Sequence, residues 1–135
     1  MDVWTYFAQR ERELRELSLA PEGPFSARVG EEAGTRGTRG RIFGKAILTE
    51  HAYLSVYELV VVVGEHIHRE EYGYFLVVDG EEIWGYERDL SHDPPVHRHT
   101  GTHERNASEP ISFRDVVEHA WHEVTERARR GETRL

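Results

Sequence analysis

Histidine and arginine side chains concentrate in one short stretch of this 135-residue chain. Four of the nine histidines fall within residues 92–103. In an extended segment His97 and His99 point the same way, because side chains alternate along a strand. That spacing suits an acid and a base on either side of a phosphate, or two imidazoles on one metal ion. The sequence leaves both chemistries open.

One interpretation combines these histidines with neighbouring arginine and aromatic side chains in metal-independent chemistry. Arg88 and Arg98 would hold a scissile phosphate, because a guanidinium group can bond to two phosphate oxygens at once. His97 and His99 would act as general base and acid, and Tyr86 would stack on a base. This pattern predicts a ribonuclease that needs no cofactor, with the arginine and histidine side chains on one face.

The alternative interpretation is a metal site made of histidine and carboxylate side chains. Cysteine is absent, so any metal ion must be bound by histidine, aspartate or glutamate. No complete metal-ligand signature is present, and solvated histidines in a proline-stiffened loop are the simpler explanation. The candidate ligands for a divalent ion such as zinc are His92, Asp93, His97 and His99.

Other polar residues have plainer explanations. His66 and His68 fit a solvated strand end. His119 and His122 fit the polar face of a helix. Glu58 interrupts an apolar strand, so its carboxylate needs either a partner or an exposed edge position. The sequence does not choose between these two environments for Glu58.

Size and composition predict one domain over residues 1–135. A mass of 15.7 kDa suits one folding unit, and the 38% apolar share with fourteen aromatic residues can fill its core. The net charge of −8 argues against broad adhesion to nucleic acid through phosphate neutralisation. The longest apolar run, residues 59–63, is far shorter than the roughly 20 residues of a membrane span. We therefore expect a cytoplasmic protein with no membrane contact.

An α+β fold is expected to position these side chains. It consists of an antiparallel meander of about four strands flanked by an N-terminal and a C-terminal helix. Glycine and arginine residues at 26–40 predict a mobile basic loop, and residues 89–106 predict a histidine-rich loop. Apolar residues on both faces of the sheet require that a helix or a second subunit cover part of each. The strands are expected at residues 41–49, 52–63, 66–78 and 81–88.

The strongest local signal is Asp79-Gly80, which is typical of a two-residue hairpin turn. Counting outward from this turn places Phe75 opposite Trp84 and Gly73 opposite Tyr86.

The last helix has equally clear boundaries. Ser112 and Asp115 form a capping box, and Ile111 with Val116 forms a hydrophobic staple. Gly131 is a natural end for this helix.

A series of features over residues 72–124 carries a family resemblance. The most specific part is Tyr86-x-x-Asp89-x-x-His92 with His97-Arg98-His99 after it. The Asp79-Gly80 hairpin and the final helix complete the series. This stretch resembles the TumE-type toxins of bacterial toxin–antitoxin pairs.

The resemblance implies a small toxin that is paired with a helix-turn-helix antitoxin and acts on RNA. A non-enzymatic alternative treats the apolar sheet face and the aromatic hairpin as a partner surface only. The partner would then be the antitoxin or a second copy in a homodimer.

Overall fold

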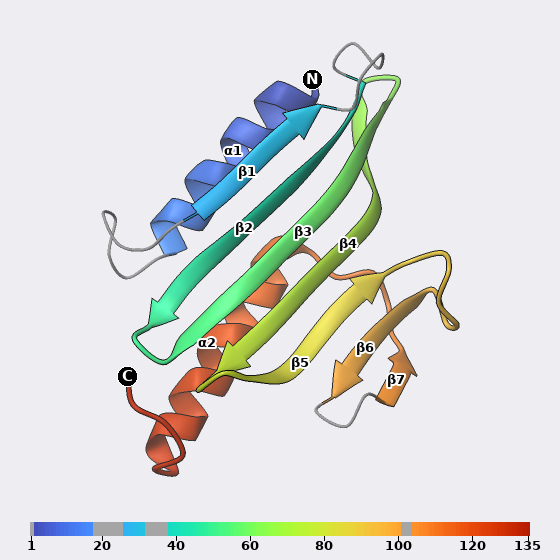
Figure 1. Ribbon diagram of the computed structural model, residues 1–135. Helices are drawn as coiled ribbons and strands as arrows, with labels where there is room; N and C mark the ends of the chain where they lie inside the picture. Colours follow the sequence, from blue (N-terminus) through green and yellow to red (C-terminus); the bar gives the residue numbers. More distant parts are fainter. Residues whose placement is uncertain (1, 18–25, 32–37, 101–103) are drawn as a thin grey trace.

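Seven antiparallel strands form one sheet whose order follows the chain (Figure 1). The structure is a computed structural model and describes residues 2–17, 26–31, 38–100 and 104–135. Every strand pairs with the next strand in sequence, so the sheet is a simple meander. The elements are α1 (Val3–Leu17), β1 (Ser26–Glu31), β2 (Arg39–Thr49), β3 (Ala52–Val63), β4 (His66–Val78), β5 (Glu81–Arg88), β6 (Val96–Thr100), β7 (Glu104–Ala107) and α2 (Phe113–Arg129).

The predicted α+β class and its two flanking helices are confirmed, but the sheet has seven strands where about four were expected. β1 lies in the segment 26–40 that was expected to be a loop. β6 and all but the last residue of β7 lie in the histidine-rich segment 89–106, which was also expected to be a loop. Both segments are poor in large apolar residues, so their intrinsic strand preference is weak. Hydrogen bonding to β2 and β5, whose edges would otherwise be unpaired, decides their conformation. Residues 32–37 and 101–103, which include His103, lie outside the described residues.

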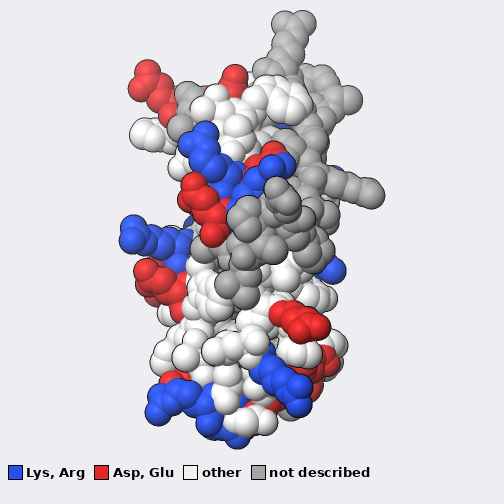
Figure 2. All heavy atoms as spheres, turned by 90° about the vertical axis from the view of Figure 1, so that its left-hand side faces the viewer, with Lys and Arg blue, Asp and Glu red and all other residues white. Residues whose placement is uncertain are grey.

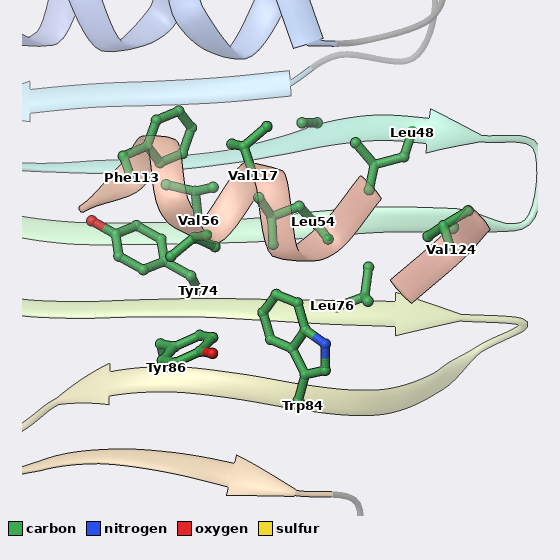
Figure 3. Close-up of a cluster of buried hydrophobic side chains, with 14 of the residues drawn as sticks. Leu48, Leu54, Val56, Tyr74, Leu76, Trp84, Tyr86, Phe113, Val117 and Val124 are labelled. Carbon is green, nitrogen blue, oxygen red and sulfur yellow. The ribbon is translucent and has the colours of Figure 1, made fainter. Parts of the chain in front are cut away.

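Both helices pack against the same face of the sheet and lie behind it in Figure 1. α2 covers the middle of this face, where its apolar stripe meets tyrosine, tryptophan and leucine side chains of β3 to β5 (Figure 3). α1 lies beside it and buries Val3 and Phe7 against Ile42 and Val60. Neither of the two described helices therefore covers the opposite face of the sheet.

We call that opposite face the open face and define it by two rows of residues that run across strands β2 to β6. Neighbouring residues in each row are direct cross-strand partners. The first row is Phe43, Tyr57, Gly73, Glu87 and His97, and the second is Lys45, Ser55, Phe75, Gly85 and His99.

The hairpin of β4 and β5 has the predicted turn at Asp79-Gly80, with positive φ angles of 51° and 78°. Its predicted register is wrong beyond the first two pairs. Phe75 lies opposite Gly85, and Trp84 lies opposite Leu76, because a bulge shifts β5 by one residue. Without the bulge Trp84 would point to the open face, whereas with it the indole is buried against α2. Burial of this large apolar ring is the physical reason for the shift.

The start of α2 is the one that the sequence predicts. The hydroxyl oxygen of Ser112 accepts a hydrogen bond of 3.1 Å from the backbone nitrogen of Asp115. Gly131 follows the helix with a positive φ of 73°. Among the described residues, no helix has the length and apolarity that a membrane crossing requires.

A buried polar network joins α1 to the sheet and answers the question that the sequence left open for Glu58. The Glu58 carboxylate is fully buried and accepts hydrogen bonds from Tyr6 (2.7 Å), Arg10 (3.2 Å) and Tyr74. Arg69 donates to the Tyr74 hydroxyl oxygen over 2.8 Å. We call these five residues the Glu58 network. Burial, together with the Glu58 charge, raises the pKa of both tyrosines above the ordinary value.

Candidate functional site

The predicted pair of histidines lies on the open face, at the end where β5 and β6 meet. His97 and His99 are two residues apart on β6 and share that face, as strand alternation predicts. Glu87 on β5 is the direct cross-strand partner of His97 and points to the same side. The pairing of β5 with β6 therefore assembles a carboxylate and two imidazoles from segments ten residues or more apart.

The three side chains converge on a single point. The Glu87 carboxylate oxygen Oε2 lies 2.6 Å from Nε2 of His99 and 3.3 Å from Nε2 of His97. The two Nε2 atoms are themselves 2.7 Å apart. His92, from the loop between the strands, places its Nδ1 atom 3.3 Å from the other carboxylate oxygen, Oε1. We call Glu87, His92, His97 and His99 the Glu87 cluster.

The members of the cluster differ in their access to solvent. The His97 side chain is completely buried, whereas the side chains of Glu87 and His99 are 16% exposed and that of His92 is 26% exposed. A molecule in solution can therefore reach His92 and His99 but not His97.

Counting protons fixes the roles of the ring nitrogens. Nδ1 of His97 lies 2.7 Å from the carbonyl oxygen of Pro94, which only accepts, so this nitrogen carries a proton. In the neutral rings one proton on Nε2 of His99 then serves both Nε2 of His97 and the Glu87 carboxylate. Nδ1 of His99 is left with a free lone pair and has no hydrogen-bond partner in the described part of the chain. The carboxylate thus fixes the orientation of an imidazole that keeps one nitrogen free to accept a hydrogen bond.

A tight loop before β6 positions His92. The backbone nitrogen and the hydroxyl of Ser91 donate to the Asp89 carboxylate over 2.9 and 2.6 Å, which forms a local turn. These hydrogen bonds lower the pKa of Asp89. The second carboxylate oxygen of Asp89 lies 3.5 Å from Nε2 of His92. His92 is thereby held between Asp89 and Glu87.

The other predicted catalytic residues lie on the helix-covered face. Tyr86 is 7% exposed, and its hydroxyl lies 2.9 Å from Nδ1 of His119 on α2. The Arg98 guanidinium lies 5.4 Å from the Tyr86 ring centre, and Arg88 shares this side of β5 by strand alternation. The sequence predicted the arginines and histidines on one face of the sheet. They lie on opposite faces, because successive side chains of β5 and β6 point to opposite sides.

The predicted metal-ligand residues do not form one group. His97 and His99 have metal-binding geometry together with Glu87, whereas His92 has it with Glu87 and Asp89. Asp93 is exposed and belongs to neither of these groups of described residues. Sequence reasoning missed Glu87 because its position opposite His97 follows from the pairing of β5 with β6, and residues 96–100 were expected to be loop.

A separate hollow of about 600 Å³ lies between α1 and α2. Glu13, Glu16 and Glu118 line it with Phe113, Arg114 and Val117, and no histidine is among these residues. It lies against the helices and is distinct from the Glu87 cluster on the open face.

The fold and the site define a small α+β protein with a histidine and carboxylate centre on the open face of a meander sheet. A family model described as toxin TumE matches residues 19–128, which is most of the chain. The chain belongs to the TumE toxin family, and the match extends well beyond the stretch in which the sequence first showed the resemblance. Searches of curated proteins and of solved structures returned no match. Membership of this family implies an antitoxin partner.

Proposed function

We propose that this toxin cleaves RNA and that the Glu87 cluster is its reactive centre. The observation that carries the proposal is one carboxylate with a solvent-accessible imidazole at each oxygen. His99 lies 2.6 Å from Oε2 of Glu87, and His92 lies 3.3 Å from Oε1. RNA fits such a centre because its 2′-hydroxyl is an internal nucleophile, so one base and one acid are enough to cleave the chain.

In the proposed reaction His99 accepts the proton of the 2′-hydroxyl through its free Nδ1 atom. The 2′-oxygen then forms a bond to phosphorus, and the bond from phosphorus to the 5′-oxygen breaks. Protonated His92 donates its proton to that 5′-oxygen. The products are a 2′,3′-cyclic phosphate and a free 5′-hydroxyl group.

His97 acts as a positioning residue in this scheme. Its ring is completely buried and touches His99 and the Pro94 carbonyl, so it fixes the orientation of His99 without reaching the substrate. The direct contact of 2.7 Å between His97 and His99 leaves no room for a phosphate between them. His92 therefore replaces His97 as the proposed acid.

The test compares purified variants on a single-stranded RNA oligonucleotide and measures growth after induced expression. His99→Ala and His92→Ala should each slow cleavage by about 100-fold or more, the usual contribution of a general base or acid. His122→Ala, an exposed histidine on α2, is the matched control and should behave like the parent. Cyclic phosphate ends support the mechanism, and equal growth arrest by the parent and His99→Ala would exclude it.

We further propose that the antitoxin is a helix-turn-helix protein, which the family resemblance implies. A neighbouring reading frame of that type, whose product co-purifies with this chain, is the expected result. A neighbour of another fold that neutralises the toxin would contradict this proposal.

A divalent metal ion is the second candidate for the same centre, and two observations favour it. The Glu87 carboxylate and one ring nitrogen each of His97 and His99 offer three ligand atoms that lie within 4.8 Å of one another. The His97 ring is anchored through Nδ1 to a backbone carbonyl, which is how ligating imidazoles are commonly oriented. Two histidines and a carboxylate suit a zinc-type ion.

Elemental analysis of untagged protein after dialysis against zinc distinguishes the two candidates. One ion per chain, lost in both Glu87→Gln and His97→Asn, supports the metal site. Full ribonuclease activity in protein without bound metal supports the acid and base mechanism.

A further inference from the structure

We propose that single-stranded RNA crosses the open face of the sheet, with bases stacked on Phe43 and Phe75 and with backbone phosphates beside Arg41 and Lys45. This inference rests on the proposed function, because it names the substrate class and the path by which the substrate reaches the Glu87 cluster. Three observations support this path, one each on β2, β3 and β4.

The first observation is the alternation of basic and aromatic side chains on β2. Arg41, Phe43 and Lys45 occupy successive open-face positions, and all three are exposed. Phe43 is 48% exposed, which is unusual for a phenylalanine that lies in the interior of a sheet. Cations on either side of an exposed ring supply both of the contacts that single-stranded nucleic acid needs, charge for the backbone and a flat surface for a base.

The second observation is that the aromatic surface continues onto β3. The Phe43 ring lies 5.1 Å from the ring of Tyr57, its direct cross-strand partner. Lys45 lies 4.2 Å from the centre of the Tyr53 ring, so its ammonium group is held on the same face. The Tyr57 hydroxyl also contacts Glu71 at 3.3 Å, which anchors this ring. The surface is therefore built and oriented before any ligand arrives.

The third observation is the place of Phe75, which joins this surface to the Glu87 cluster. Its ring covers Gly73 on its own strand and Gly85 on β5. A Cβ atom at Gly85 would lie 2.3 Å from the Phe75 ring, and one at Gly73 would lie 2.8 Å from it. Because both positions lack side chains, the ring can lie down against the sheet. Its centre is 6.1 Å from that of His99.

These side chains lie along the two cross-strand rows that define the open face. The rows begin at Phe43 and Lys45 on β2 and end at His97 and His99 on β6. Four strand spacings separate the two ends, or about 19 Å. A strand of RNA that follows the rows passes Phe75 immediately before it reaches His99. Phe75 thus takes the stacking role that the sequence had given to the buried Tyr86.

Charge favours RNA over a protein partner on this face. Lysine is depleted in protein–protein interfaces, whereas here Lys45 lies beside aromatic residues. The basic side chains on β2 are a local exception in a chain with a net charge of −8. On the side of the molecule that carries α1, basic and acidic side chains are interspersed, as Figure 2 shows.

The test measures fluorescence anisotropy of a labelled single-stranded RNA oligonucleotide with the full chain. His99→Ala is present in every sample, so that the RNA is bound but not cleaved. Phe43→Ala and Phe75→Ala should each weaken binding by about 5- to 100-fold, the range for the loss of one stacked base. Phe43→Tyr and Phe75→Tyr should restore most of the affinity. Lys45→Ala should reduce the dependence of binding on salt by about one phosphate contact.

Trp4→Ala is the matched control, because Trp4 is an aromatic residue of α1 that is 50% exposed. It should bind RNA like the parent. Circular dichroism of each variant shows whether the fold is retained. Equal affinity of the parent, Phe43→Ala and Phe75→Ala, or equal binding of duplex RNA, would overturn the inference. If these variants lose binding while the otherwise unmodified chain does not cleave RNA, the inference stands and the proposed reaction fails.

Discussion

Glu58 and Glu87 lie on opposite faces of the same sheet, one fully buried and the other 16% exposed. Their hydrogen-bonding partners differ in whether they can accept as well as donate. Glu58, under α1, accepts from two tyrosine hydroxyls and one guanidinium group, all of which have protons to donate. Glu87 faces imidazoles, which can either donate or accept. The partners of Glu58 are therefore donors only, whereas the imidazole partners of Glu87 have both donor and acceptor nitrogens.

The comparison indicates that Glu58 stabilises the fold and that Glu87 is the better candidate for a reactive group. Arginine and neutral tyrosine keep their protons at physiological pH, so the contacts of Glu58 do not change. An imidazole nitrogen can donate or accept a proton, and two of the histidines near Glu87 are accessible. The hydrogen-bond partners thus give stability at one glutamate and proposed reactivity at the other.

The largest expected effect is the loss of stability in Glu58→Ala. Removal of the carboxylate leaves the Arg10 charge and two tyrosine hydroxyls without their shared acceptor. We expect the free energy of unfolding to fall by about 3–5 kcal/mol, measured by urea denaturation. Glu87→Ala should cost no more than about 1 kcal/mol, and equal losses in the two variants would contradict the comparison.

Glu87→Gln should have the largest effect on activity. The amide keeps the volume of the side chain but removes the charge that orients His99, so RNA cleavage should fall by about 100-fold. Its stability should change by less than about 1 kcal/mol. Glu58→Gln is the matched variant and should be less stable, yet cleave normally per folded molecule. The opposite assignment of the two effects would reverse the roles of the glutamates.

Alkaline pH should weaken the Glu58 network selectively. The pKa values of Tyr6 and Tyr74 are raised in the folded protein by burial and by the Glu58 carboxylate. Their contribution to stability is complete below pH 10, where unfolded tyrosine is also protonated, and is lost as the pH rises above 10. The loss should be up to about 1.4 kcal/mol per pH unit for each group.

Unfolding measured between pH 9 and pH 11 checks this expectation. Tyr6→Phe should show a shallower dependence on pH than the parent, because one of the two groups is removed. The same slope in both proteins would show that folding does not raise the pKa of Tyr6.

The smallest expected effect concerns the loop that holds His92. Asp89→Ala removes the acceptor for the Ser91 hydrogen bonds and should cost about 1 kcal/mol of stability. Cleavage should slow by only a few-fold, since Glu87 still contacts His92. Asp89→Asn keeps an acceptor and should recover the stability. A loss as large as that in Glu87→Gln would move Asp89 into the reactive centre.

Local chemistry predicted several parts of the structure correctly. Asp79-Gly80 forms its turn because aspartate and glycine tolerate positive φ angles. Ser112 starts α2 because its hydroxyl can accept from a backbone nitrogen at the helix end. His97 and His99 share a face because side chains alternate along any extended segment. Each of these features depends on residues that are close together in the sequence.

What the tertiary structure decided depends on contacts between distant residues. The pairing of β5 with β6 placed Glu87 rather than Asp93 beside the histidines, and strand alternation moved Tyr86 to the other face. Burial of Trp84 against α2 shifted the hairpin register by one residue. The packing of α1 brought Tyr6 and Arg10 to Glu58, which lies 52 and 48 residues away from them in the sequence. Hydrogen bonds between strand edges and the burial of large rings settle these positions, and neither is set by neighbouring residues alone.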